Sequence, residues 1–282
     1  MEVAKASKRK SILSWSIAWL LGLCWTAVAT LPFVFMIINS FKERFEMLTK
    51  GIFSLPDAWN LENYKVIIEG NFIQYFINSV VVLVISLGIL LFISACGAYP
   101  LSRFQFKLAK PIFALIVACM SIPIHITLIP VFKLSQQMGV YDTIWALIGP
   151  YVATAIPISV FILTSFMKGI PSEIEEAAQI DGCSKYQMFF KVMLPLVKPG
   201  LATLAIYNGV NMWNEFSFAY TLTHTASSRT LPLAVWEFQG QYAMNVPLVM
   251  AVLTLTVLPM IILFIFMQDK LVKGMTAGAV KG

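Results

Sequence analysis

The chain alternates between long apolar runs and short segments that carry most of its charged residues. A helix needs about 20 mostly apolar residues to cross a bilayer. Six runs come close to this length or exceed it. The pattern therefore predicts six membrane-spanning helices, near residues 12–39, 72–100, 111–134, 142–167, 199–220 and 247–268.

Prolines lie inside the third and fourth runs, at Pro123, Pro130, Pro150 and Pro157. Proline removes a backbone hydrogen bond and kinks or breaks a helix. Membrane helices tolerate this where neighbouring helices or a cavity satisfy the freed carbonyl groups. Two interpretations stay open: helices that are broken beside a moving pathway, and kinked helices that only pack against their neighbours.

Lys and Arg orient the predicted helices, because short cytoplasmic loops of membrane proteins are enriched in both residues. With the N-terminus inside, the inner segments hold most of the 20 basic residues. Most of the basic residues left outside share one loop with acidic residues. Both termini and the segment 168–198 are therefore predicted to be cytoplasmic.

This topology also predicts the organisation of the chain. A basic tail and the first transmembrane helix occupy 1–40, and an extracytoplasmic loop occupies 41–71. Five further helices form a core at 72–270, which includes a cytoplasmic segment at 172–195. Residues 271–282 then form a cytoplasmic tail.

The composition agrees with a membrane protein, since 59% of the 282 residues are hydrophobic, 12% are charged and the mean hydropathy is +0.79. Soluble domains carry about 25% charged residues. The net charge of +6 does not indicate nucleic-acid binding, because that function needs basic residues clustered on one face of a soluble fold. Membrane topology explains the positions of the scattered basic residues better than a nucleic-acid-binding face does.

Several kinds of chemistry have no counterpart in the sequence. No Gly-Lys dipeptide occurs, so there is no phosphate-binding loop of the G-x-x-x-x-G-K-[ST] type. His125 and His224 lack the spacing to Cys or acidic partners that a metal site needs. We therefore expect no metal, no cofactor of its own and no enzymatic activity.

The fifth apolar run contains the polar residues Asn208, Asn211 and Glu215, which fall on one face at 100° per residue. Polar groups inside a span usually face a bundle interior or a water-filled cavity. One interpretation is a translocation pathway for a polar, uncharged solute. Hydrogen bonding between helices is an equally open alternative for the asparagines, and a lone carboxylate also suits a proton or cation site.

An aromatic segment follows in the outer loop between the fifth and sixth runs. It includes the candidate contact residues Trp236, Phe238, Gln239 and Tyr242. Aromatic and amide side chains suit both sugars and protein interfaces. The segment is therefore a candidate contact for an external partner or solute, and the alternative is an aromatic belt at the membrane interface.

The cytoplasmic segment reads as two short helices. Two capping boxes are predicted, Ser172 with Glu175 and Ser184 with Gln187. Gly182 suits the left-handed position that ends the first helix, and Pro195 is expected to end the second.

One face of the first helix is predicted to be small, because Ala177 and Ala178 share it with Ile174 and Asp181. Small residues allow close approach to another protein. Bulky Met188, Phe189 and Val192 of the second helix are instead expected to pack against the bundle. The segment therefore resembles a docking helix on a strut.

The order of residues within this segment is specific. Glu176-Ala177-Ala178, then Gly182, Val192 and Leu194-Pro195, resembles the "EAA" motif of binding-protein-dependent ABC importer permeases. Val192 stands where the family has Ile. Further stretches resemble the carbohydrate, maltose-type subgroup: "NSV" at 78–80, "AYPLSRFQF" at 98–106, "TLPLAVWEFQGQY" at 230–242 and the terminal "GMTAGAVKG".

The resemblance implies a type I ABC importer permease fold with six transmembrane helices in a prokaryotic cell membrane. It implies a second homologous permease subunit, two ATPase subunits that bind ATP and Mg²⁺, an extracytoplasmic solute-binding protein and a sugar substrate. The ATPase-coupling residues would be Glu176, Ala177, Ala178, Asp181, Gly182, Leu194 and Pro195. The alternatives from other classes are an ion-coupled secondary carrier that acts alone and a membrane scaffold protein.

Overall fold

The protein is almost entirely helical in the computed structural model, which describes the backbone of residues 2–241 and 245–279. Side chains are described for residues 15–238 and 245–266. No β-strand occurs in these ranges, as expected where spanning segments must satisfy their own backbone hydrogen bonds. The prediction of an all-α membrane protein is confirmed.

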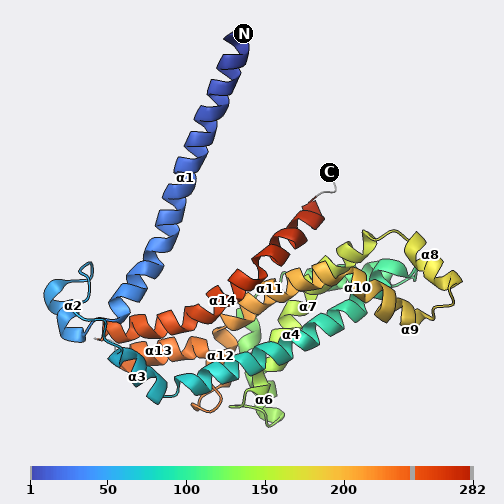
Figure 1. The fold of residues 1–282 in the computed structure, drawn as a ribbon. Helices are drawn as coiled ribbons and strands as arrows, with labels where there is room; N and C mark the ends of the chain where they lie inside the picture. The colour runs from blue at the N-terminus through green and yellow to red at the C-terminus, as the bar shows by residue number, and fades with distance from the viewer. Residues whose placement is uncertain (1, 242–244, 280–282) are drawn as a thin grey trace. The chain divides into compact units, whose positions relative to one another are not determined.

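The chain divides into two compact units, which we call unit 1 (residues 1–70 and 237–257) and unit 2 (residues 71–236 and 258–282). Unit 1 contains α1 (Glu2–Ser40), α2 (Arg44–Lys50) and α3 (Glu62–Glu69). The helices α13 (Leu231–Gln241) and α14 (Val246–Ala279) have residues in both units. Unit 2 contains α4 (Phe72–Arg103), α5 (Ala109–Cys119), the 3-10 helix η1 (Ile124–Thr127), α6 (Leu128–Gln137), α7 (Trp145–Lys168), α8 (Glu173–Ile180), α9 (Lys185–Gln187), the π-helix η2 (Met188–Met193), α10 (Leu194–Leu196), α11 (Lys198–Trp213) and α12 (Ser217–Leu222) (Figure 1).

Four helices in the described part of the chain are long and apolar enough to cross a membrane: Trp15–Ser40, Phe72–Arg103, Trp145–Lys168 and Val246–Phe266. Two bent pairs add up to two more spans. Ala109–Cys119 meets Ile124–Gln137 at 96°, and Lys185–Leu196 meets Lys198–Trp213 at 67°. The count of six predicted spans is reached only if each bent pair is one span.

Proline acts differently in the third and fourth predicted spans. The third breaks just before Pro123, between α5 and η1. The helix α7, by contrast, continues through both Pro150 and Pro157. Of the two interpretations left open, the third span therefore fits a broken helix and the fourth a continuous helix that packs against its neighbours.

The fifth predicted span is interrupted, which the sequence analysis did not expect. Helix α11 ends at Trp213, and α12 begins at Ser217. The Glu215 carboxylate lies in the break and accepts hydrogen bonds from the backbone amides of Phe218 (2.9 Å) and Ala219 (3.2 Å). Because a carboxylate is favourable at the first turn of a helix, Glu215 starts a new helix rather than continuing the old one.

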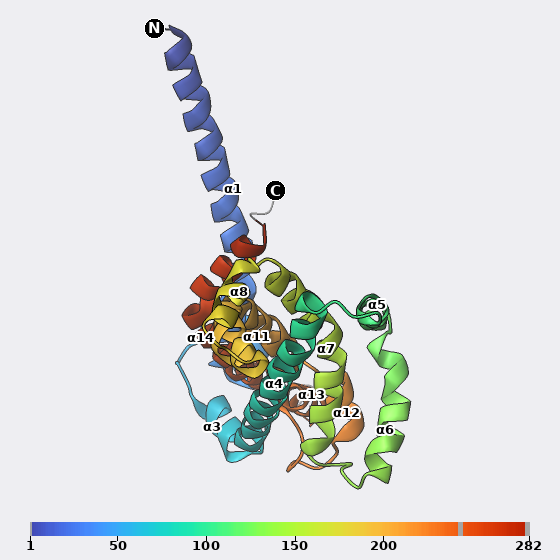
Figure 2. The same cartoon turned by 90° about the vertical axis from the view of Figure 1, so that its right-hand side faces the viewer.

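Unit 2 is built around α4 and α7, which pack along each other (Figure 2). Two clusters of buried side chains lie along this pair. One includes Val82, Leu147 and Phe218, and we call the second, at the other end of α4, the inner cluster: it includes Tyr99, Phe189 and Met193. The inner cluster brings α4, α7 and η2 together beside the predicted cytoplasmic segment.

Polar residues at the start of α4 hold the segment before α13. The Asn78 amide nitrogen donates to the backbone oxygens of Ser227 (2.9 Å) and Arg229 (2.8 Å), and the Ser79 hydroxyl accepts from the Leu231 amide (2.7 Å). Buried polar groups are costly unless they are hydrogen-bonded. These hydrogen bonds give the two polar residues of the "NSV" stretch, Asn78 and Ser79, a structural role.

Unit 1 has its own polar anchor. The Asn63 amide nitrogen donates to the backbone oxygens of Ser40 and Lys42, each at 2.9 Å. The side chain of Lys42 is fully buried and donates to the backbone oxygen of Gly51 at 3.2 Å. Burial lowers the pKa of Lys42 from its usual value, against the opposing charge of Glu46. By contrast, α1 exposes every side chain from 15 to 34, as a lipid-facing helix would.

Candidate functional site

The predicted cytoplasmic segment folds as two short helical pieces, α8 and α9–η2–α10, around a turn at Gly182. Gly182 has φ of +81°, so the prediction of a left-handed glycine is confirmed. A Cβ atom at this position would meet nothing within 4 Å. Backbone conformation, rather than lack of space, therefore requires glycine here.

The second piece begins as predicted. The Ser184 hydroxyl accepts from the Gln187 amide (3.3 Å), and the Gln187 side chain accepts from the Ser184 amide (2.8 Å), which confirms this capping box. The helix then widens into η2 and ends at Leu196, one residue beyond Pro195. Leu194 is half-buried and Pro195 is exposed.

The first capping box was predicted wrongly. Ser172 has helical backbone angles, and its side chain caps nothing. Glu175 instead forms an ion pair with Arg103, the last residue of α4, with 2.5 Å between Oε1 and Nε. Residues 72 positions apart in the sequence cannot be paired from local spacing, so the sequence analysis missed this contact.

Helix α8 also presents its faces differently from the prediction. Ala178 is half-buried against the inner cluster, whereas Ala177 is exposed. Glu176 and Asp181 are exposed too, and Ile180 is 87% exposed. The predicted shared face of two alanines is therefore split, because Glu175 and Ala178 turn inward together.

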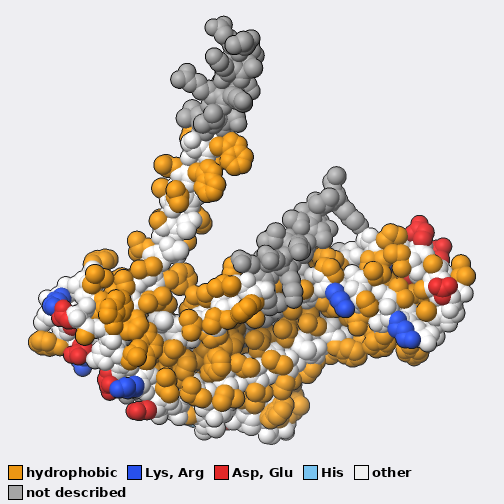
Figure 3. Space-filling model, in the orientation of Figure 1, with side chains coloured by type: hydrophobic (Ala, Val, Ile, Leu, Met, Phe, Trp, Pro, Cys, Tyr) orange, Lys and Arg blue, Asp and Glu red, His pale blue; other side chains and the backbone are white. Residues whose placement is uncertain are grey.

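The outer surface of α8 combines charge with an exposed apolar residue. Acidic side chains gather over this helix (Figure 3). The acids of its first turn are Glu173, Glu175 and Glu176, and Ile174 and Ile180 are exposed among them. Ile174 and Ile180 thus add apolar area to a surface that is otherwise charged.

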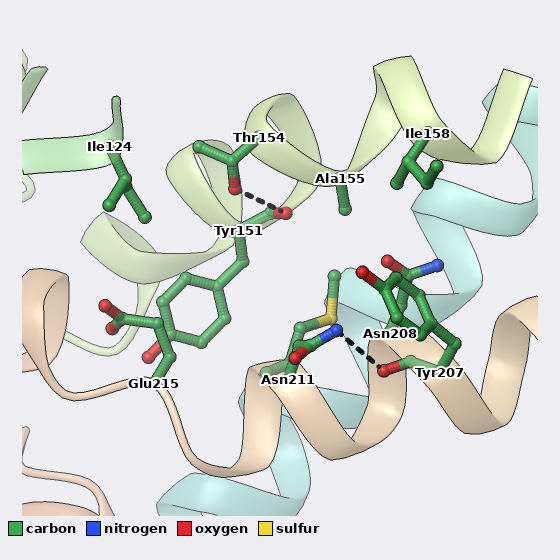
Figure 4. A pocket seen from close by; sticks show the side chains of 10 residues that line it. Ile124, Tyr151, Thr154, Ala155, Ile158, Tyr207, Asn208, Asn211 and Glu215 are labelled. Carbon is green, nitrogen blue, oxygen red and sulfur yellow. Dashed lines mark hydrogen bonds between the residues drawn. The ribbon is translucent and has the colours of Figure 1, made fainter. Parts of the chain in front are cut away.

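A cavity of about 270 Å³ lies in unit 2 between α7 and the α11–α12 break. It brings together all three polar residues predicted from the fifth run, namely Asn208, Asn211 and Glu215. The remaining lining residues are Ile124, Tyr151, Thr154, Ala155, Ile158, Tyr207 and Met212 (Figure 4). Tyr151 and Thr154 come from α7, and no periodicity in the fifth run points to them.

The two asparagines of the cavity differ in their surroundings. Asn208 is only 2% exposed, and its amide nitrogen donates to the Ser159 hydroxyl (3.1 Å) and to the Leu204 backbone oxygen (3.0 Å). Asn211 is exposed and donates within its own helix, to the backbone oxygen of Tyr207 (3.0 Å). Asn208 therefore joins α11 to α7, as the structural alternative predicts, whereas Asn211 is available to a solute.

Glu215 supplies the charge of the cavity, and it is held from two sides. Two backbone amides of α12 donate to its carboxylate, and the ring of Tyr151 from α7 lies beside it (Figure 4). No basic residue lines the cavity. The cavity thus offers hydrogen bonds, an exposed tyrosine ring and one negative charge, which suits a neutral polar solute better than an anion.

The candidate contact residues of the predicted outer loop lie mostly on a helix, α13, rather than on a loop. Trp236 is 48% exposed and meets the Tyr220 ring edge-on at 5.2 Å. Phe238 is 8% exposed and is part of the buried core. The side chains of Gln239 and Tyr242 lie outside the described residues.

Asp142, which the sequence analysis did not single out, holds the segment after α12. It has φ of 58°, and its carboxylate accepts from the backbone amides of His224 (2.6 Å) and Thr225 (2.9 Å) and from the Ser228 hydroxyl (2.5 Å). Burial alone would raise the pKa of Asp142, but these hydrogen bonds outweigh it and lower the pKa to about 2.

Among the described residues no group of His, Cys, Asp and Glu could hold a metal ion.

Residues 87–277 match the family described as "binding-protein-dependent transport system inner membrane component". A putative ABC transporter permease protein of Caldicellulosiruptor is 50% identical over 92% of this chain and 94% of its own length. The arabinooligosaccharides transport system permease protein of Halalkalibacterium halodurans is 34% identical over 98% of this chain and 100% of its own. A chain of a bacterial ABC transporter that imports alginate has the same fold, with a TM-score of 0.77 and 22% identity over 92% of this chain and 96% of that one. The protein therefore belongs to the inner membrane components of binding-protein-dependent transport systems, the permeases of ABC transporters.

Proposed function

We propose that this chain forms half of the translocation pathway of an ATP-driven importer for a neutral sugar or oligosaccharide. The observation that carries the proposal is the 34% identity, over almost the whole chain, to a permease named for arabinooligosaccharide transport. A second, similar permease subunit would form the other half of the pathway. An extracytoplasmic binding protein would deliver the solute.

The chemistry of the cavity supports a neutral solute. Asn211 and Thr154 offer hydrogen bonds, and the exposed Tyr207 ring offers a flat apolar surface. Sugars present both hydroxyl groups and apolar ring faces, so such a lining suits them. An anionic solute would meet the Glu215 carboxylate without a basic residue to balance it.

Energy would come from separate ATPase subunits, which bind ATP and Mg²⁺. The chain itself has no phosphate-binding loop. The exposed side of α8, with Glu176, Ala177 and Asp181, would dock into a cleft of the ATPase, and Gly182 would shape the turn beside it. Leu194 and Pro195 would then lead the chain back into the membrane through the 67° bend.

The orientation follows from the distribution of Lys and Arg. In this proposal both termini and α8 face the cytoplasm, and both bent pairs cross the membrane, which gives six spans. Trp236 would lie on the outer side, where its half-exposed ring can contact the binding protein. The setting is the cell membrane of a prokaryote.

Reconstituted transport tests the proposal. The complete complex, purified with this chain and placed in liposomes with its binding protein outside, should accumulate radiolabelled arabinotriose or another neutral di- or trisaccharide only when ATP is inside. An ion-coupled carrier gives the opposite result: this chain alone would accumulate the sugar, and an uncoupler would abolish uptake. A scaffold protein would leave sugar uptake unchanged after deletion of its gene.

One observation disfavours the ion-coupled alternative. A coupling carboxylate must bind and release a cation or proton during each cycle. Glu215 is instead committed to two backbone amides. Its protonation would remove the cap of α12, so it is better suited to a structural charge than to a coupling site.

A further inference from the structure

The ion pair between Arg103 and Glu175 lies in unit 2 and is largely shielded from solvent, with each side chain 12% exposed. Arg103 ends α4, and Glu175 lies in the first turn of α8. A second guanidinium nitrogen of Arg103 donates to the Ile170 backbone oxygen at 2.8 Å. Arg103 therefore holds both α8 and the turn that precedes it.

Tyr99 extends this contact into the inner cluster. Its hydroxyl lies close enough to the Glu175 carboxylate for the two groups to interact. Its buried ring meets the Phe104 ring at 5.4 Å and the Phe189 ring at 5.3 Å. The Glu175 carboxylate thus links α8 to α4. The packed rings of Tyr99 and Phe189 in turn link α4 to η2.

Helix capping does not explain this arrangement. Any acid in the first turn of α8 would benefit from the positive end of the helix, wherever its side chain pointed. Glu173 and Glu176 occupy the same turn and are exposed. Glu175 alone of the three turns inward, where separating it from Arg103 would leave a charge with little access to water.

The partners of this contact lead toward the cavity. Helix α4 packs along α7, and α7 contributes Tyr151 and Thr154 to the cavity lining (Figures 1 and 2). The exposed side of α8 faces away from the inner cluster. A displacement of α8 can therefore reach α7 through α4 if α8 and α4 move together, but not if α8 tilts on its own.

We propose that the Arg103–Glu175 pair is a positioning link that keeps α8 fixed to the end of α4, so that force applied to α8 moves the α4–α7 pair instead of tilting α8 alone. This inference rests on the proposed function, because it assumes that an ATPase acts on α8. Arg103 and Glu175 are positioning residues in this role, since neither contacts the solute cavity.

The test is the ratio of sugar transported to ATP hydrolysed, measured with the complete complex in liposomes. Glu175→Gln removes the charge and keeps the size of the side chain. It should leave co-purification of the ATPase unchanged and preserve at least half of the ATP hydrolysis, yet lower the transport ratio about fivefold, within the range for residues that carry coupling. Glu173→Gln, at an exposed position in the same turn, should keep the wild-type ratio.

Variants of Arg103 separate positioning from folding. Arg103→Lys keeps the charge but not the planar, multi-donor geometry, so its ratio should fall between wild type and Glu175→Gln. Exchange of the charges, Arg103→Glu with Glu175→Arg, should recover at least part of the ratio that each single variant loses. Such recovery would show that the two side chains act as a pair, whereas a pair needed only for folding would change the yield of the complex and leave the ratio of the folded complex unchanged.

Two results would overturn the link. A Glu175→Gln complex with the same transport ratio as Glu173→Gln would show that the pair carries no coupling. Loss of the ATPase from the Glu175→Gln complex would show a role in docking instead. Failure of the proposed function looks different, because then the wild-type complex itself shows no ATP-dependent sugar uptake.

Discussion

Residues 172–195, which we call the coupling segment after their role in the proposed function, and the cavity both lie in unit 2 and use polar residues in opposite ways. In α8 the inward residues Glu175 and Ala178 are committed to the protein's own core, and Glu176 and Ile180 are left exposed. In the cavity, by contrast, hydrogen bonds within the protein occupy most of the polar groups. Asn208 bonds to Ser159, and Glu215 bonds to α12. The segment thus offers a surface to a partner, whereas the cavity offers only a few free groups.

This difference fits what each region would bind in the proposed function. A protein partner is held by a large, fixed surface, of which a few residues contribute most of the affinity. A transported solute must enter and leave in each cycle, so it cannot be held tightly. We therefore expect single substitutions to have larger effects in the coupling segment than in the cavity.

The largest effect is expected for Gly182→Asp. At φ of +81° any residue with a Cβ is strained, by about 1–2 kcal/mol, and the new carboxylate adds bulk to the docking surface. A docking loss of more than about 1.4 kcal/mol weakens association at least about tenfold. We expect the ATPase to be lost on co-purification and sugar uptake to fall below about a tenth of wild type, while the chain still inserts into the membrane.

Gly139→Asp is the matched control for this variant. Gly139 also has a left-handed conformation (φ +69°) with nothing within 4 Å of a built Cβ, but it follows α6 rather than α8. It should carry similar strain without losing the ATPase. Equal loss of the ATPase in both variants would mean that strain, not docking, explains the Gly182 result.

A smaller effect is expected for Asn211→Leu. The exposed Asn211 amide can bind a solute, and one lost hydrogen bond costs about 0.5–1.5 kcal/mol, which corresponds to about a two- to tenfold loss. Sugar uptake should fall by this factor while the ATPase still co-purifies. Unchanged uptake would show that Asn211 does not contact the solute.

The chain offers a close control for Asn211→Leu. Asn214, directly after α11, is also exposed and donates to the backbone oxygen four residues earlier, Val210, at 2.9 Å. It does not line the cavity. Asn214→Leu should therefore keep wild-type uptake. Asn208→Leu is not a suitable control, because it leaves buried Ser159 without its partner.

The sequence predicts the parts of the fold that depend on local composition or on fixed spacing. Apolar runs identified the four helices that are long enough to cross a membrane and the two bent pairs, since a span must be apolar over most of its length. The turn at Gly182 and the capping box at Ser184 were predicted correctly because each depends on residues within a few positions of each other. The same local reasoning wrongly predicted one continuous span over 199–220, because the apolar pattern does not show that the Glu215 carboxylate caps a new helix, α12.

The candidate sites depend more on distant contacts, and here the sequence reasoning was incomplete. Asn208, Asn211 and Glu215 were expected on one face and do line one cavity, although a helix break separates the last from the others. Tyr151 and Thr154 belong to another helix. The inward turn of Glu175 depends on Arg103, which no pattern within α8 could indicate.

The smallest effect is expected beyond the cavity, where Asp142 anchors the segment that follows α12. Asp142→Asn keeps a side chain that tolerates positive φ. It removes the negative charge from the side-chain oxygen that accepts three hydrogen bonds. Because the pKa of Asp142 falls from 3.8 to about 2 on folding, the charged form stabilises the folded state at pH values above 3.8. That contribution is about 1–2 kcal/mol.

Thermal unfolding of the purified complex in detergent, measured from pH 7 down to pH 2, tests this charge. Below pH 3.8 protons begin to bind the unfolded chain first, so the stabilisation is lost progressively as the pH falls through about 2. The variant should unfold a few degrees below wild type at pH 7, and the gap should close between about pH 4 and pH 2. A gap that stays constant across this range would show that shape, not charge, holds the segment. The negative charge of Asp142 would then contribute little to the stability of the segment after α12, in contrast to the ion-paired charge of Glu175 in α8.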